Sequence, residues 1–225
     1  MTAQILTTLQ QVVTTDELLE DITLPDGSIA TINKYSTLLF PKSFSATERV
    51  VTLEGEGFFK VTKNTTQPFI VKTKHSEVKV LGTSFNVRAY ENEPTTLVEV
   101  EEGSVAFNIP TLNQEKILRA NDKVIFNSTN ATLSEIETLK WQDVAWKAKK
   151  INFDNQPIEE VLTYINKNFD LKVEFEANKL EGCSLSSTLV ENQPEAILNR
   201  VKSAFPLITL TKINSKLYKI SGNCQ

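Results

Sequence analysis

The chain has 225 residues, of which 40% are hydrophobic and 23% charged, a composition typical of a folded protein with a buried core and not of a disordered one. Its 24 Lys and Arg residues are outnumbered by 28 Asp and Glu residues, so the net charge of -4 argues against nucleic acid or an anionic membrane surface as a partner. No stretch approaches the roughly 20 consecutive apolar residues of a membrane-spanning helix, and we expect the chain as given to be soluble.

The part of the chain from about residue 18 to residue 136 alternates apolar and polar residues in short runs rich in Val, Ile, Thr and Phe. Turn residues such as Asp26-Gly27, Gly82 and Gly103 separate the runs. Because no helical pattern lies between them, these strands cannot form a parallel crossover sheet. We therefore predict a mainly β N-terminal domain over residues 1–137, built as an antiparallel sandwich, a jelly roll or a short solenoid.

Two kinds of site are conceivable in this β-rich part. Glu54 and Glu56 stand two positions apart on a strand, which places them on one face at roughly 6.5–7 Å, near the spacing of a glycosidase carboxylate pair. A solvated strand face gives the same pattern, so a hydrolase is the last of our hypotheses. The alternative function is a carbohydrate-binding module of the cell envelope, with Phe58, Phe59 or Tyr90 as stacking platforms.

Residues for catalysis or metal binding are scarce. His75 is the only histidine, so one chain can build neither a site with two His ligands nor a His-based catalytic relay. Ser84 stands in the run LGTSFN, which lacks the GxSxG context of a serine nucleophile. We predict no catalytic residue, no metal site and no cofactor, and hence no enzyme.

A linker at residues 138–149 contains Trp141 and Trp146. Beyond it, the apolar residues no longer recur at every second position but at the three-to-four-residue spacing of a helix. Pro157 suits a first helical turn, and one apolar stripe follows it. Alternating runs at residues 150–153 and 171–176 flank this helix as strands. The stripe consists of Ile158, Val161, Leu162, Ile165 and Phe169.

The same unit recurs further along the chain. The triplet NQP at residues 155–157 reappears at residues 192–194, and a matching stripe follows it, formed by Ile197, Leu198, Val201 and Phe205. Strands at residues 207–213 and 216–221 end the chain. We predict a small α+β domain of two strand-helix-strand repeats over residues 150–225. Whether Cys183 and Cys224 form a disulfide is open, because the spacing alone does not decide it.

A small sheet of this kind leaves at least one border strand with unpaired N–H and C=O groups, and such an edge accepts a strand from a partner. By pattern, the first candidate edge is residues 216–221, with Leu217, Tyr218 and Ile220 as partner-binding residues. The second is the run CSLSSTL, with Leu185 and Ser187. Both alternate, and neither has the proline or charge cluster that protects natural edges.

Several of these segments resemble the FecR family of transmembrane anti-sigma regulators. The C-terminal domain is similar to the short N-terminal domain of secretins and TonB-dependent receptors, a likeness carried by residues 146–162. Where the family usually has Gly, this chain has Ala148 and Lys149 in one turn and Asn121-Asp122 in another, so we expect local changes there. The matching strings are LPDGS (Leu24–Ser28), TINKYSTLLFP (Thr31–Pro41), VTLEGEGFFKV (Val51–Val61), PFIVKT (Pro68–Thr73), VKVLGTSFNVRAY (Val78–Tyr90) and VEEGSV (Val100–Val105).

The resemblance implies a place and a partner. Family members join a cytoplasmic segment, which handles a sigma factor, through one inner-membrane helix to an envelope region. Neither of the first two is contained in these 225 residues. The likeness implies that this chain is the periplasmic region, that it binds the N-terminal domain of a TonB-dependent outer-membrane receptor, and that regulated proteolysis follows. The ligand of the receptor, iron chelate or glycan, the sigma factor and the oligomeric state stay open.

Overall fold

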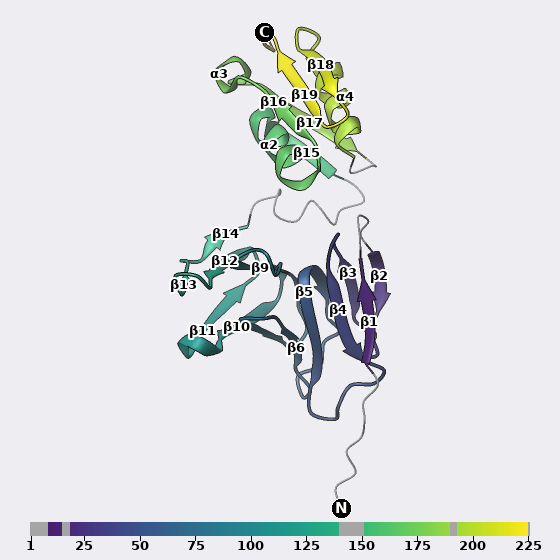
Figure 1. Cartoon of the computed structure of the whole chain (residues 1–225), viewed down its shortest axis with the longest axis vertical. Coiled ribbons are helices and arrows are strands. Elements are labelled where there is room, and N and C mark those ends of the chain that lie inside the picture. Colours follow the sequence, from purple (N-terminus) through teal and green to yellow (C-terminus); the bar gives the residue numbers. More distant parts are fainter. Residues whose placement is uncertain (1–8, 15–18, 140–150, 190–192, 225) are drawn as a thin grey trace, which may run out of the picture. The chain divides into compact units, whose positions relative to one another are not determined.

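The computed structural model describes residues 9–14, 19–139, 151–189 and 193–224. The chain forms two compact units, Met1–Lys140 and Trp141–Gln225 (Figure 1). Trp141, Trp146 and Asn192, and with them most of the predicted linker, lie outside the described residues. None of the described helices is long and apolar enough to cross a membrane.

The first unit is a large curled sheet, as the prediction of a mainly β domain required. Its described residues contain no α-helix and one 3-10 turn, η1 (Pro110–Leu112). The strands are β1 (Leu9–Val13), β2 (Leu19–Thr23), β3 (Ile29–Ile32), β4 (Thr37–Pro41), β5 (Arg49–Lys60), β6 (Phe69–Lys72), β7 (Glu77–Val80), β8 (Ser84–Ala89), β9 (Thr95–Glu102), β10 (Ser104–Ile109), β11 (Gln114–Arg119), β12 (Asp122–Asn127), β13 (Thr132–Leu133) and β14 (Glu137–Thr138).

The long strand β5 joins the two halves of this sheet. Its first residues pair with β4 and, in parallel, with β6, whereas its last residues pair with β3 and β8. From β6 one half continues through β7 and β10 to β11, and from β8 the other continues through β9 to β12. β5 is therefore the strand that pairs with both halves.

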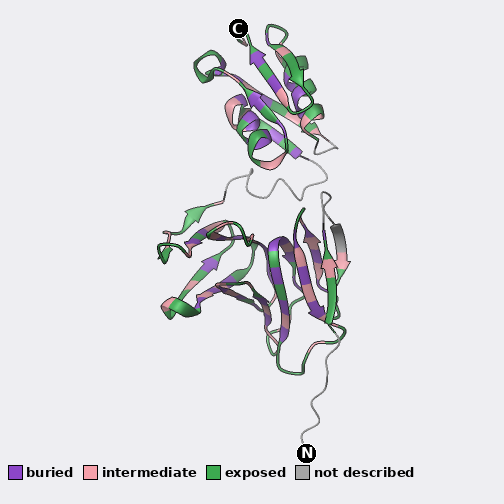
Figure 2. Ribbon diagram, in the orientation of Figure 1, coloured by how far each residue is buried: buried purple, intermediate pink, exposed green. Residues whose placement is uncertain are grey.

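Period-two alternation fills the space between these halves with one apolar core (Figure 2). Phe59 on β5 stands at its centre, with its ring centroid 5.5 Å from that of Phe85 and 6.0 Å from that of Phe69. All three side chains are completely buried. Each contributes roughly 1.5–3 kcal/mol from burial, so the alternating runs that predicted strands also supply the stability of the unit.

The second unit has the predicted order of strand, helix and strand, repeated once. A short helix between the repeats, α3, was not predicted. The elements are β15 (Ile151–Pro157), α2 (Ile158–Asn168), β16 (Lys172–Glu174), α3 (Ala177–Leu180), β17 (Ser184–Leu189), α4 (Pro194–Ala204), β18 (Thr209–Asn214) and β19 (Leu217–Ser221). Strands β15 and β17 form one small sheet, and a second sheet has the order β16-β19-β18.

The two long helices connect these small sheets. Helix α2 contacts β15 and β16, and α4 contacts β17 and β18, so each helix touches both sheets. In each helix the predicted apolar stripe is the buried face. Val161 and Ile165 of α2 are fully buried, as are Ile197 and Val201 of α4. Pro194 occupies the first turn of α4, where a helix tolerates its missing N–H.

A disulfide between Cys183 and Cys224 answers the question that the sequence left open. The two Cα atoms are 6.0 Å apart, and the bond ties the residue before β17 to the tail that follows β19. It closes a loop of 41 residues, for which the chain-entropy estimate of the stabilisation is about 4 kcal/mol.

Candidate functional site

The predicted partner-binding residues Leu217, Tyr218 and Ile220 lie on β19, which is the middle strand of its sheet. Strand β16 pairs with it on one side and β18 on the other. Tyr218 and Ile220 are only 7% and 4% exposed. The expectation that this strand is an open edge is therefore wrong, because alternation reveals one buried face but not which neighbours occupy the two borders.

The two borders of this sheet are β16 and the strand that precedes β19, β18, and each pairs with β19 alone among the described strands. Five of the six residues of β18 are exposed and Leu210 is half-buried. Leu207, in the turn before β18, and Ile213, near the end of the strand, are 59% and 54% exposed, and no other large apolar side chain in the described part of this unit is so open. Sequence reasoning chose the wrong strand of the hairpin, although the apolar run from Leu207 to Ile213 was visible.

The second predicted edge, β17, pairs only with β15 among the described strands, so one of its borders is open. The side chain of Leu185 is 1% exposed and faces the core. Ser187 is half-buried, and its hydroxyl oxygen accepts a hydrogen bond of 2.7 Å from Arg200 Nε. Contact between a partner and these two residues stays a prediction, and it would have to use the backbone and not the Leu185 side chain.

In the first unit, the segment LPDGS has a structural task. Asp26 Oδ2 lies 2.6 Å from Arg49 Nη1, and the Arg49 side chain is 1% exposed. The same guanidinium donates to the carbonyl oxygens of Gln67 and Thr62, at 2.9 Å each. Ser28 Oγ donates to Asp26 and accepts from the Thr62 backbone N–H. The contacts of this family-like segment are therefore structural: Asp26 forms an ion pair with the buried Arg49, and Ser28 supports it with hydrogen bonds.

A second buried polar cluster joins three further motif segments. Asn86 Nδ2 donates to Glu56 Oε1 at 2.9 Å and to Glu99 Oε2 at 2.8 Å, and Asn33 Nδ2 donates to the other Glu56 oxygen at 2.8 Å. Glu56, Asn86 and Glu99 are at most 4% exposed. Arg88 Nη1 stands 3.5 Å from Glu56. These side chains join the residue that follows β3 to strands β5, β8 and β9.

The structure does not form the carboxylate pair, and it excludes one of the three candidate sugar platforms. Glu56 is buried in the polar cluster while Glu54 is exposed and lines a pocket, so the two do not form a carboxylate pair. The strand alternation that suggested the pair fails at Gly55, whose φ is +101°. Phe59 is fully buried and cannot stack on a sugar. Phe58 is half-buried and Arg88 lies 4.9 Å from the centroid of the Tyr90 ring, so sugar stacking on Phe58 and Tyr90 stays a prediction.

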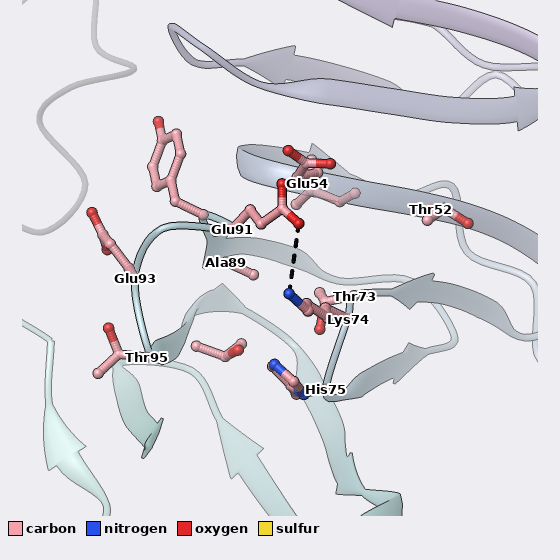
Figure 3. Close-up of a pocket in the computed structure, with 12 residues that line it drawn as sticks. Thr52, Glu54, Thr73, Lys74, His75, Ala89, Glu91, Glu93 and Thr95 are labelled. Atoms are coloured by element: carbon pink, nitrogen blue, oxygen red, sulfur yellow. Dashed lines mark ion pairs between the residues drawn. The ribbon is translucent and has the colours of Figure 1, made fainter. Parts of the chain in front are cut away.

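A pocket of about 390 Å³ opens where β5 passes from one half of the sheet to the other (Figure 3). Its rim carries His75 and Lys74, and Lys74 Nζ lies 3.6 Å from Glu91 Oε1. Tyr90 also lines it, and its hydroxyl donates to the Lys34 carbonyl oxygen at 2.9 Å. Burial raises the pKa of the Tyr90 phenol above its ordinary value. Among the described residues, no group of three or more His, Cys, Asp or Glu side chains could hold a metal ion.

Comparison with known proteins gives matches along most of the chain. The family model described as FecR protein matches residues 10–106, and the model described as FecR, C-terminal, matches residues 150–217. None of the curated proteins matches. Two crystal structures of a candidate anti-sigma factor from Parabacteroides distasonis ATCC 8503 are similar, each with 27% identity and a TM-score of 0.63. One alignment covers 96% of this chain and 100% of the other, and the second covers 95% and 99%.

Proposed function

The chain belongs to the FecR family of regulators, and we propose that it is the periplasmic region with which such a regulator receives its signal. Its partner is the N-terminal signalling domain of a TonB-dependent outer-membrane receptor. A membrane helix and a cytoplasmic segment outside this sequence would pass the signal to a sigma factor. The disulfide supports the proposed compartment, because such bonds persist in oxidising surroundings such as the periplasm.

The open border of β18 is the observation that carries this proposal. A border strand presents N–H and C=O groups that a second strand can pair with, and its exposed side chains would lose water on docking. The receptor domain is, by the family resemblance, a small sheet of similar design with edges of its own. Pairing of two edges would therefore join the sheets without any catalytic step.

Binding of the isolated receptor domain, measured by calorimetry, tests this edge. Ile213→Lys places a charge on β18 and Leu207→Lys places one in the turn before it, and neither disturbs the core, since both side chains are already exposed. We expect affinity to fall at least tenfold, because burying an aliphatic side chain contributes roughly 1.5–3 kcal/mol. The matched control is Ile117→Lys, at an exposed position on β11 of the other unit.

The test also separates the two candidate edges of the second unit. Loss of binding in Ser187→Pro together with full binding in Ile213→Lys and Leu207→Lys would transfer the interface to β17. Unchanged affinity in all three variants would remove both edges and with them the proposed mode of docking.

A further inference from the structure

The seam in the first unit, where β5 leaves one half of the sheet for the other, has an unfilled strand position. On the side of β5 opposite β3 and β4, strand β6 pairs with Arg49–Thr52 and β8 pairs with Gly55–Lys60. Leu53 and Glu54 lie between these ladders and face no described strand on that side. Gly55 permits the change of direction: a Cβ there would stand 2.2 Å from Ser36 Oγ. The gap is thus a consequence of the strand order and not of a loose loop.

The pocket of Figure 3 lies over this gap. Leu53 and Thr96, which line it, are buried, and the turn after β6 and the segment after β8 contribute the rest of the lining. Its volume of about 390 Å³ falls in the range of roughly 300–1,000 Å³ that small-ligand pockets occupy. Thr52, Thr73 and Thr95 line it as well, and the Thr73 hydroxyl already forms a hydrogen bond with Ser76. Such a lining suits a ligand with several hydrogen-bonding groups.

Of the three carboxylates that line the pocket, two are paired with a basic side chain and one is not, among the residues that the structure describes. Glu93 is held by Arg88, through hydrogen bonds from Nε and Nη2, and Glu91 pairs with Lys74 at 3.6 Å. Glu54 makes no ion pair within the part of the chain that the structure describes, and it is exposed to solvent. The pocket therefore has a surplus of negative charge, and it favours a cationic group.

We propose that this seam binds an extended peptide segment of a partner protein that carries a basic side chain. Its backbone would pair with the free side of β5 at Leu53 and Glu54, and its cationic group would lie beside Glu54. Main-chain hydrogen bonds would supply the affinity, and the Glu54 carboxylate would select a peptide with a basic side chain. In strand addition generally, affinity comes from the backbone and specificity from side-chain contacts. The proposal concerns the first unit alone and does not depend on docking at β18.

Amide chemical-shift mapping of the isotope-labelled chain tests the site. The probe is the peptide Ac-Thr-Val-Lys-Val-Thr-NH2, compared with the same peptide carrying Glu in place of Lys and with maltotriose. We expect shifts confined to residues 52–54, 73–75 and 89–96, and affinity about fivefold higher for the Lys peptide, as one charge contact at a wet surface provides. Absence of binding by both peptides at millimolar concentration, equal affinities, or the same shifts with maltotriose would overturn the proposal.

Two variants fix the location. Glu54→Gln should abolish the preference for the Lys peptide. The control Glu77→Gln should leave it intact, because Glu77 is a half-buried carboxylate on β7 that pairs with Lys72 at 3.4 Å and does not line the pocket. Thr52→Phe should fill the pocket and remove binding of both peptides while the unfolding temperature stays within a few degrees. Retained preference in Glu54→Gln, or retained binding in a folded Thr52→Phe, would place the peptide elsewhere.

Discussion

The two units of the chain stabilise themselves by different means. All the buried polar and charged side chains among the described residues belong to the first unit, including Arg49, Glu56 and Glu99. The second unit buries the stripes of two helices and is closed by a disulfide. A buried ion pair is weak evidence of stability, but breaking it by removing one partner is costly because the other charge is left without a partner. The first unit is therefore held in part by buried polar and charged pairs, whereas the second relies on apolar packing and a disulfide.

Breaking the Asp26–Arg49 pair should produce the largest effect and should be confined to the first unit. Arg49→Met removes the guanidinium and leaves the Asp26 carboxylate, whose side chain is 13% exposed, without its partner. We expect the free energy of unfolding of this unit to fall by about 3–5 kcal/mol. Urea denaturation measures it, with the exposed Arg119→Met as control. A loss below about 1 kcal/mol would contradict the structural task assigned to the motif.

Removing the disulfide should have the next largest effect and should fall on the second unit. The double variant Cys183→Ser/Cys224→Ser frees the tail after β19, and we expect a loss of about 2–4 kcal/mol because the unfolded chain regains the freedom of a 41-residue loop. Hydrogen exchange resolved by residue would show faster exchange in β17 and β19 and unchanged rates in β5 and β8. A matching loss of protection in β5 would mean that the two units do not unfold separately.

The sequence predicts some features of the second unit correctly and misses others. The helical stripe led by Val161 and Ile165 and the repeated NQP triplet identified the repeats of the second unit, because periodicity is a local property. Strand order is not local, so β19 was mistaken for a border although β16 occupies its other side. The short helix α3, which has no periodic stripe, was missed.

The buried polar clusters of the first unit were invisible for the same reason. Asp26 and Arg49 are far apart in the sequence, and only the fold shows that their side chains meet. Strand alternation predicts that Glu54 and Glu56 share one face, but the positive φ of Gly55 interrupts the alternation between them. The motif segments were recognised as matches, but their physical role required the pairing of β3, β5, β8 and β9.

The smallest expected effect is a dependence on alkaline pH that originates in the first unit. Burial raises the pKa of Tyr90 in the folded state, so the neutral phenol is favoured there. This contribution to stability is complete below the ordinary tyrosine pKa near 10 and disappears as the pH rises through the higher folded value. Its size should stay below about 1 kcal/mol, since Tyr90 is only half-buried and solvent screens it.

Comparison of the wild-type chain with Tyr90→Phe isolates this effect. The variant lacks the hydrogen bond to the Lys34 carbonyl at every pH, so the wild type should be the more stable by a constant amount below pH 10. Above that pH the difference should shrink, because only the wild type has a phenol that ionises more easily when unfolded. Unfolding free energies at a series of pH values measure it. A difference that grows with alkaline pH would mean that the folded protein stabilises the phenolate, and the pH dependence would then need another source than the burial of Tyr90.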